Sequence, residues 1–220
     1  MRRAVARSGL MAKWSTELEP GQDLAWRTVL ELFARLGRAP RLKEIASELD
    51  MPEEKLAAVL HQLHGRDLIG VDENQSAIVH AYPLAQRDTG HRVELNGVRL
   101  NALCAVDALG MGSMYRRDVA IQSACRCCGT EIRITTAQRG TALASRSPAG
   151  SVVWYDHAYE QTAAASCCPM IAFFCSDAHL QVWLTRQVPA RIGCRLALDE
   201  AFEVGRAIFG PVLSPATSPV

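Results

Sequence analysis

The sequence predicts an α+β protein in which a winged-helix-like domain of three helices precedes a mixed α/β core with short antiparallel strands. Three observations support this prediction: helical spacing of apolar residues in the first third, a change to short β-like segments after Pro83, and two amphipathic helices near the C-terminus. We expect four parts, a flexible N-terminal arm at 1–22, the winged-helix-like domain at 23–84, the core at 85–212 and a C-terminal tail at 213–220.

Apolar residues recur at helical spacing in three segments of the first domain, residues 23–36, 41–49 and 53–65. Gly37 is a natural stop for the first helix. Asp50-Met51-Pro52-Glu53 offers the third helix an N-cap, an early proline and a capping glutamate. Two apolar segments joined by a polar turn follow, residues 68–71 and 77–81. Three helices and a hairpin are the pattern of a winged helix.

The core is predicted to begin with a β-hairpin, because Asn96-Gly97 lies between two β-like segments. A short helix over 101–109, with a glycine-rich exit at Gly110 and Gly112, places Cys104 and Asp107 three residues apart on one helical face. The further expected elements are strands at 118–122, 131–135, 152–155 and 170–174, and helices at 176–186 and 199–209. Residues 137–150, rich in serine, glycine and alanine, are expected to form a loop.

Charge and hydropathy restrict the function classes. The chain has 24 basic and 23 acidic residues, so no global field attracts it to nucleic acid. The third helix offers Lys55 and His61, but Glu53 and Glu54 lie at the end that would approach a DNA groove, so a DNA-binding regulator is the least favoured function. We expect neither a signal peptide nor a membrane span, and hence a cytoplasmic protein without a membrane partner.

Seven of the eight cysteines lie between Cys104 and Cys175, and this clustering is the main indication of function. In a reducing compartment, dense cysteines indicate metal binding or catalysis rather than disulfides. Cys104-Ala-Val-Asp107 combines a soft nucleophile with a group that can accept and return a proton. The alternative is a buried core cysteine beside a capping aspartate.

A second thiol motif, Cys125-Arg-Cys127-Cys128-Gly129, has the C-x-x-C form of a zinc knuckle. The adjacent pair Cys167-Cys168 would close a four-thiolate site only with strain. A structural zinc is therefore the less favoured interpretation, and a second metal site of Cys125, Cys128 and Cys168 stays open. Four other residues are expected to have packing or surface roles rather than ligand roles, Cys175, Cys194, His157 and His179.

Over residues 24–213 the chain resembles the organomercurial (alkylmercury) lyases. Four segments carry the resemblance, Cys104-Ala-Val-Asp107-Ala-Leu, Ser123-Ala-Cys125, Ser166-Cys167-Cys168 before Phe173-Phe174, and Asp199-Glu200-Ala-Phe-Glu-Val-Gly205. The resemblance implies a winged-helix-like N-terminal region joined to a core that carries the catalytic thiols.

The resemblance also implies the chemistry. Cys104 and Cys167 would capture R–Hg⁺, Asp107 would relay a proton to the departing carbon, and all three would contact the mercury of the substrate or the bound Hg(II) product. Cys125 would be structural. The reaction needs no organic cofactor, gives a hydrocarbon and Hg(II), and belongs to mercury resistance and detoxification, with cellular thiols and a mercuric reductase as expected partners.

The second catalytic thiol can be assigned in two ways. Alignment of the cysteine pair itself favours Cys167, whereas counting back from Phe173 favours Cys168; we expect Cys167. The alternative to a lyase is a non-catalytic relative that binds Zn, Cu or Hg through its thiolates.

Overall fold

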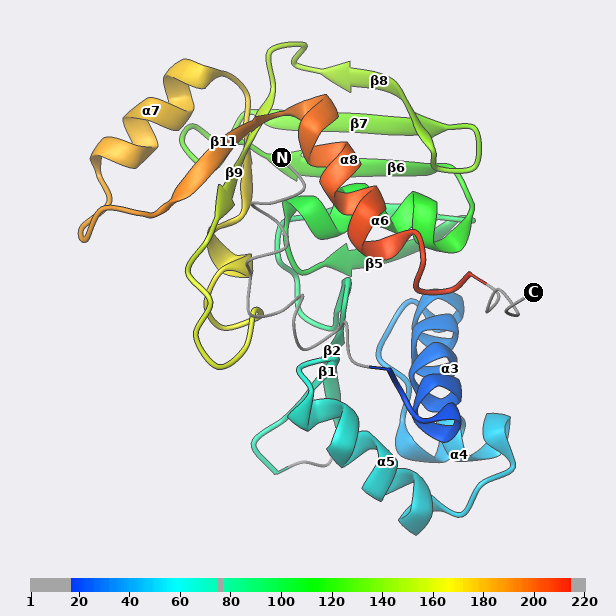
Figure 1. The fold of residues 1–220 in the computed structure, drawn as a ribbon. Helices are drawn as coiled ribbons and strands as arrows, with labels where there is room; N and C mark the ends of the chain where they lie inside the picture. Colours follow the sequence, from blue (N-terminus) through cyan, green and yellow to red (C-terminus); the bar gives the residue numbers. More distant parts are fainter. Residues whose placement is uncertain (1–16, 75–76, 215–220) are drawn as a thin grey trace.

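The computed structural model describes residues 17–74 and 77–214, and the chain folds there as a mixed α+β protein (Figure 1). Strands form two antiparallel sheets, an eight-stranded sheet of order β1-β2-β3-β5-β4-β6-β7-β8 and a three-stranded sheet of order β10-β9-β11. The α+β class predicted from the sequence is therefore confirmed. Most of the residues expected to form the N-terminal arm and the C-terminal tail lie outside the described residues.

The three predicted N-terminal helices are present as α3 (Pro20–Leu36), α4 (Leu42–Leu49) and α5 (Glu53–Gly65). Asp50, however, does not cap the third helix. It ends α4 in the left-handed conformation (φ 49°), with its N–H bonded to the Ala46 carbonyl, and Pro52 is the N-cap of α5. Aspartate tolerates this conformation better than most residues, which explains why it serves the preceding helix.

The N-terminal hairpin continues into the large sheet. Its strands are β1 (Ile69–Val71) and β2 (Ile78–Ala81), and β2 also pairs with β3 (Leu84–Ala85), which pairs with β5 (Val98–Ala102). The sheet is completed by β4 (Arg92–Leu95), β6 (Val119–Ala124), β7 (Glu131–Ala137) and β8 (Ala142–Ser147). One sheet thus links the N-terminal helices to the core.

The turn between β4 and β5 confirms the predicted hairpin. Asn96 and Gly97 both have positive φ, 52° and 78°, as a two-residue turn of this kind requires. The expected loop over 137–150 is wrong in its middle, because β8 forms there. Its side chains are mostly half-buried or exposed and show no apolar alternation, so only its pairing with β7 defines the strand.

The helix expected at 101–109 is displaced. Asn101 and Ala102 belong to β5, where they pair with Arg92 and with Leu84, and the helix α6 (Ala105–Tyr115) begins after Cys104. The strand ladder outweighs the local helical pattern before Cys104. The expected exit at Gly110 and Gly112 is also wrong, because both glycines lie inside α6.

The remaining elements build the second sheet and its cover: β9 (Val152–Asp156), the 3₁₀ turn η1 (Cys168–Met170), β10 (Ala172–Phe174), α7 (Asp177–Thr185), β11 (Gly193–Ala197) and α8 (Leu198–Phe209). Helix α6 is buried almost throughout its length, and α8 crosses it in front of β6 and β7 (Figure 1). Among residues 17–74 and 77–214, no helix combines the length and the apolar character that crossing a bilayer requires.

Candidate active site

Cys104 is the N-cap of α6, and this position fixes its thiol. Its backbone is extended (φ −150°), and its Sγ accepts a hydrogen bond from the Asp107 backbone N–H at 3.4 Å. The side chain is buried, with 1% of its surface exposed. Burial raises the pKa of the Cys104 thiol to about 11, and the neighbouring Cys168 thiol opposes that shift by hydrogen bonding.

Asp107 lies one turn into α6, also buried. Its Oδ2 has no hydrogen-bond partner among the described residues. Burial raises the pKa of the Asp107 carboxyl to about 7, although the Cys104 thiol and backbone act in the opposite direction. A carboxyl with a pKa near neutrality can both accept and release a proton at physiological pH.

Cys168 completes a three-group cluster with these two residues. The Sγ atoms of Cys104 and Cys168 and a carboxylate oxygen of Asp107 all lie within 4.8 Å of one another. The Cys168 segment is held against α6 because the Ala105 N–H donates to the Ile171 carbonyl at 3.2 Å. Hydrogen bonding, first of all to Cys104, raises the pKa of Cys168 well above its usual range.

Cys167, the thiol expected from the sequence, lies beside this cluster rather than in it. Its Sγ is 3.8 Å from the Ala163 carbonyl oxygen, and 9% of its surface is exposed, more than for Cys104 or Cys168. A hydrogen bond from the Cys168 thiol lowers the pKa of Cys167. The geometry therefore places Cys168 next to Cys104 and Asp107, and makes Cys167 the more readily ionised of the adjacent pair.

Sequence reasoning missed a polar network that anchors the Cys167-Cys168 segment. The buried Asp67 carboxylate accepts hydrogen bonds from the Tyr82 hydroxyl at 3.1 Å, the Tyr159 hydroxyl at 3.1 Å and the Ala163 N–H at 2.9 Å. The Tyr82 hydroxyl in turn accepts from the Ala164 N–H at 2.7 Å. Nothing in the spacing of these residues could have revealed the network, because Asp67 and Ala163 are 96 positions apart.

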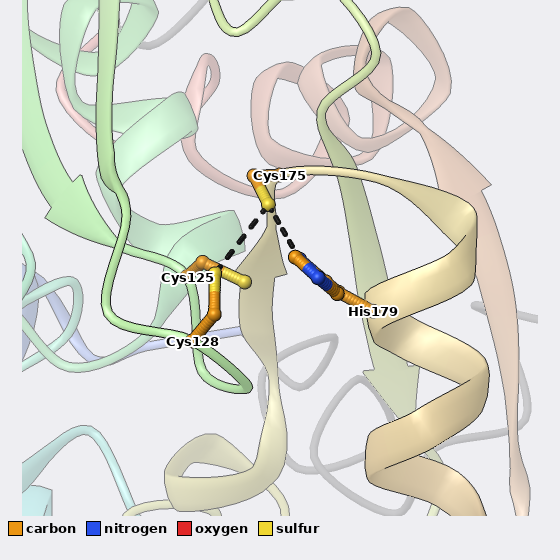
Figure 2. A group of neighbouring side chains, drawn as sticks. All are labelled: Cys125, Cys128, Cys175 and His179. Carbon is orange, nitrogen blue, oxygen red and sulfur yellow. Dashed lines mark hydrogen bonds between the residues drawn. The ribbon is translucent and has the colours of Figure 1, made fainter.

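A second group of potential ligands contains Cys125, Cys128, Cys175 and His179 (Figure 2). The second site considered from the sequence paired Cys125 and Cys128 with Cys168, but Cys168 belongs to the first cluster. The expectation that His179 lacks a partner at ligand spacing is wrong, since its Nδ1 lies 2.8 Å from the Cys175 Sγ. The spacing of four between Cys175 and His179 was the available signal.

The chain has recognisable relatives among known proteins. A family model described as MerB, alkylmercury lyase, matches residues 84–210, more than half of the chain. The chain belongs to the alkylmercury lyase family. The resemblance inferred from the sequence is therefore confirmed.

Alignments with individual relatives extend over most of this chain. The alkylmercury lyase of Staphylococcus epidermidis is 30% identical over 182 residues, which cover 82% of this chain and 79% of the relative. The alkylmercury lyase of Bacillus cereus is 27% identical, with 87% and 84% covered. A solved structure, the mercury-bound form of MerB2, has a TM-score of 0.76 at 24% identity and covers 97% of this chain and 98% of its own, so the fold is shared along nearly the whole length.

Proposed function

We propose that this protein is an organomercurial lyase that cleaves the carbon–mercury bond by protonolysis and releases a hydrocarbon and Hg(II). The observation that carries the proposal is the buried cluster in which the Asp107 carboxyl lies within 4.8 Å of the thiols of Cys104 and Cys168. Soft thiolates are the preferred ligands of a soft metal, and an adjacent carboxyl supplies the proton that the departing carbon needs. Membership of the alkylmercury lyase family supports the same reaction.

The steps balance without a redox change. Cys167 first takes R–Hg⁺ from the thiol-bound substrate, and the carrier thiol leaves with the proton that Cys167 gives up. The Cys104 thiol then forms an S–Hg bond, its proton passes to the Asp107 carboxylate, and Cys167 leaves the mercury as a thiolate. The Cys168 thiol passes its proton to the released Cys167 thiolate, binds the mercury as the second sulfur ligand and weakens the C–Hg bond. That bond breaks with both electrons remaining on carbon, the Asp107 proton transfers to the carbon, and R–H leaves. Mercury stays Hg(II), held by two sulfurs.

The three thiols have different roles in this proposal. Cys104 and Cys168 hold mercury beside Asp107, because their sulfur atoms and the carboxylate form the cluster. Cys167 makes the first capture from the thiol-bound substrate, because it is the most exposed of the three and its pKa is lowered. The alternative, predicted from the sequence, is that Cys167 and not Cys168 is the second mercury ligand during cleavage. Serine variants of the two residues distinguish these assignments.

Two further expectations belong to the same proposal. The reaction needs no organic cofactor, since the thiols and the carboxyl perform every step. Cellular thiols and a mercuric reductase would accept Hg(II) in the cytoplasm. The N-terminal region, residues 23–84, would be a winged-helix-like packing module whose Asp67 anchors the Cys167-Cys168 segment, rather than a DNA reader.

The test measures methane or benzene and Hg(II) released from methylmercury or phenylmercury in excess thiol. We expect release above the thiol-only control from the wild type, none from Cys104→Ser or Cys168→Ser, slowed release from Cys167→Ser and unchanged release from the control Cys194→Ser. An inactive Cys167→Ser with an active Cys168→Ser would support the sequence-based assignment instead. Stoichiometric mercury binding without hydrocarbon would indicate a non-catalytic thiolate protein and overturn the proposal.

A further inference from the structure

The proposed C–Hg cleavage leaves the second thiol group unused. The ligand atoms of Cys125, Cys128, Cys175 and His179 all lie within 4.8 Å of one another. Figure 2 shows the Cys175 sulfur between the Cys125–Cys128 turn and the His179 ring. Three thiols and one imidazole are a complete ligand set for a tetrahedral metal ion.

The turn between β6 and β7 holds the first two ligands in knuckle form. The Gly129 N–H donates to the Cys125 carbonyl at 2.8 Å, and the Cys125 N–H donates to the Thr130 carbonyl at 2.8 Å. Gly129 has φ 75°, a conformation that favours glycine. The turn thereby brings the sulfur atoms of Cys125 and Cys128 within 4.8 Å of each other and of the ligand atoms of Cys175 and His179.

The other two ligands come from the junction of β10 and α7. Ser176 caps α7 by accepting a hydrogen bond from the His179 N–H at 3.3 Å. Cys175 lies just before this cap and His179 lies within the first turn, so the helix start fixes both. The knuckle is attached to the same segment, because the Arg126 N–H donates to the Phe173 carbonyl at 3.0 Å.

The separations suit zinc. A tetrahedral ion with Zn–S bonds of about 2.3 Å needs sulfur atoms about 3.8 Å apart, and the Cys128 and Cys175 Sγ atoms are 3.7 Å apart. The 2.8 Å between the Cys175 Sγ and the His179 Nδ1 is a direct hydrogen bond. An ion between these two atoms needs a separation of about 3.5 Å, so the imidazole would withdraw by less than about 1 Å.

We propose that Cys125, Cys128, Cys175 and His179 bind one structural Zn²⁺ that joins the two sheets of the molecule. Two ligands come from the β6–β7 turn of the large sheet, and the other two come from the segment just after β10 of the small sheet and from the first turn of α7. The catalytic groups are divided in the same way, since Cys104 follows β5 and Cys168 precedes β10. The ion would therefore fix the separation of the two halves of the active site without taking part in the chemistry.

Zinc fits this group better than the two obvious rivals. A Cys128–Cys175 disulfide would leave Cys125 and His179 unused and would not persist in a reducing compartment. A captured Hg(II) ion does not need four ligands, because the proposed cleavage already leaves it on two sulfurs. Four converging soft and borderline ligands match a closed structural zinc site.

The experiment measures metal content by mass spectrometry in full-length protein purified with reductant and without added metal. We expect about one zinc per chain. Cys128→Ser and Cys175→Ser should lose it, whereas Cys127→Ser, in the same turn but outside the ligand group, should retain it. Cobalt substitution should give the intense visible bands of a tetrahedral thiolate site in the wild type and in Cys127→Ser.

The catalytic variant Cys104→Ser separates this proposal from the lyase proposal, because it should lose hydrocarbon release and keep its zinc. Zinc absent from the wild type, zinc lost in Cys104→Ser but kept in Cys128→Ser, or an intact Cys128–Cys175 disulfide would each overturn the zinc site. Should the serine variants not fold, His179→Cys preserves four ligands. It should bind one zinc, and its cobalt derivative should show stronger thiolate-to-metal charge transfer than the wild type; an unchanged spectrum would exclude His179 as a ligand.

Discussion

Ionisation of the Asp107 carboxyl costs free energy in the folded protein. It is buried, its Oδ2 has no partner among the described residues, and burial raises its pKa from 3.8 to about 7. An aspartate in the unfolded chain ionises near pH 4, so folding opposes ionisation between about pH 4 and pH 7. The contribution of Asp107 to the free energy of unfolding is therefore highest below about pH 4, where the carboxyl is protonated in both the folded and the unfolded state. This contribution is lost as the pH rises from about 4 through the folded pKa of about 7.

Replacement of Asp107 should accordingly separate activity from stability. Asp107→Asn removes the proton relay, and we expect a rate loss of about 10²–10⁴-fold. The same change removes the cost of ionising the buried carboxyl. The difference in unfolding free energy between the variant and the wild type should therefore shift in favour of the variant by about 2–3 kcal/mol from pH 5 to pH 8. Urea unfolding at the two pH values measures this gain. A difference that does not change with pH would show that Asp107 ionises normally in the folded protein.

At the scale of elements, the crossing of α6 and α8 sets the position of the catalytic groups. A Cβ added at Gly110 of α6 would lie 2.7 Å from the Gly205 carbonyl oxygen and 2.5 Å from Phe209 of α8. Such distances are below van der Waals contact, so the helices approach this closely only because both crossing residues are glycines. Since α6 carries Cys104 and Asp107, any separation of the helices moves the active site.

We expect Gly110→Ala to destabilise the protein by about 1–3 kcal/mol through overpacking and to lower the rate of hydrocarbon release. Gly65→Ala is the matched control, because a Cβ there meets nothing within 4 Å at the end of α5. The control should be neutral or more stable by up to about 1 kcal/mol. Thermal unfolding and hydrocarbon release measure both variants, and equal behaviour of the two would contradict the packing argument.

The segment that carries Cys167 and Cys168 depends on the Tyr82 hydroxyl. Tyr82→Phe leaves the Ala164 N–H without its acceptor and removes a donor to Asp67, so we expect a loss of about 1–3 kcal/mol together with slower hydrocarbon release. Tyr159→Phe removes a donor to the same carboxylate but leaves the Ala164 bond intact, and should have the smaller effect. A larger effect of Tyr159→Phe would show that the Ala164 bond does not position the segment.

The sequence predicted the elements with strong local signals and missed those defined by pairing alone. The helix at Glu53–Gly65 and the Asn96-Gly97 turn carry their own proline and glycine signals. The strand β8 has no such signal, and the start of α6 is decided by the pairing of Asn101 with Arg92. The site shows the same division. The spacing of Cys104 and Asp107 is local, whereas the contacts of Cys168 with Cys104 and of Cys128 with Cys175 depend on long-range packing.

At the scale of the whole molecule, the N-terminal helices and the core are joined by more than the polypeptide. Strands β1 and β2 belong to the same eight-stranded sheet as β6 and β7. The Tyr115 hydroxyl of α6 donates to the Leu30 carbonyl of α3 at 2.9 Å, and Asp67 accepts from the Ala163 N–H. These contacts connect the region before Pro83 to both halves of the active site.

We therefore expect the protein to unfold as one cooperative unit, although the sequence predicts a boundary near residue 84. A single transition of about 220 residues should have a calorimetric enthalpy of roughly 150 kcal/mol near 60 °C, equal to its van 't Hoff enthalpy. An independent N-terminal domain of about 60 residues would instead give a separate transition of roughly 40 kcal/mol. Differential scanning calorimetry of the wild type distinguishes the two results. Two transitions would mean that the shared sheet and the Asp67 network do not couple the regions, and Tyr82→Phe should then leave the transition of the core unchanged.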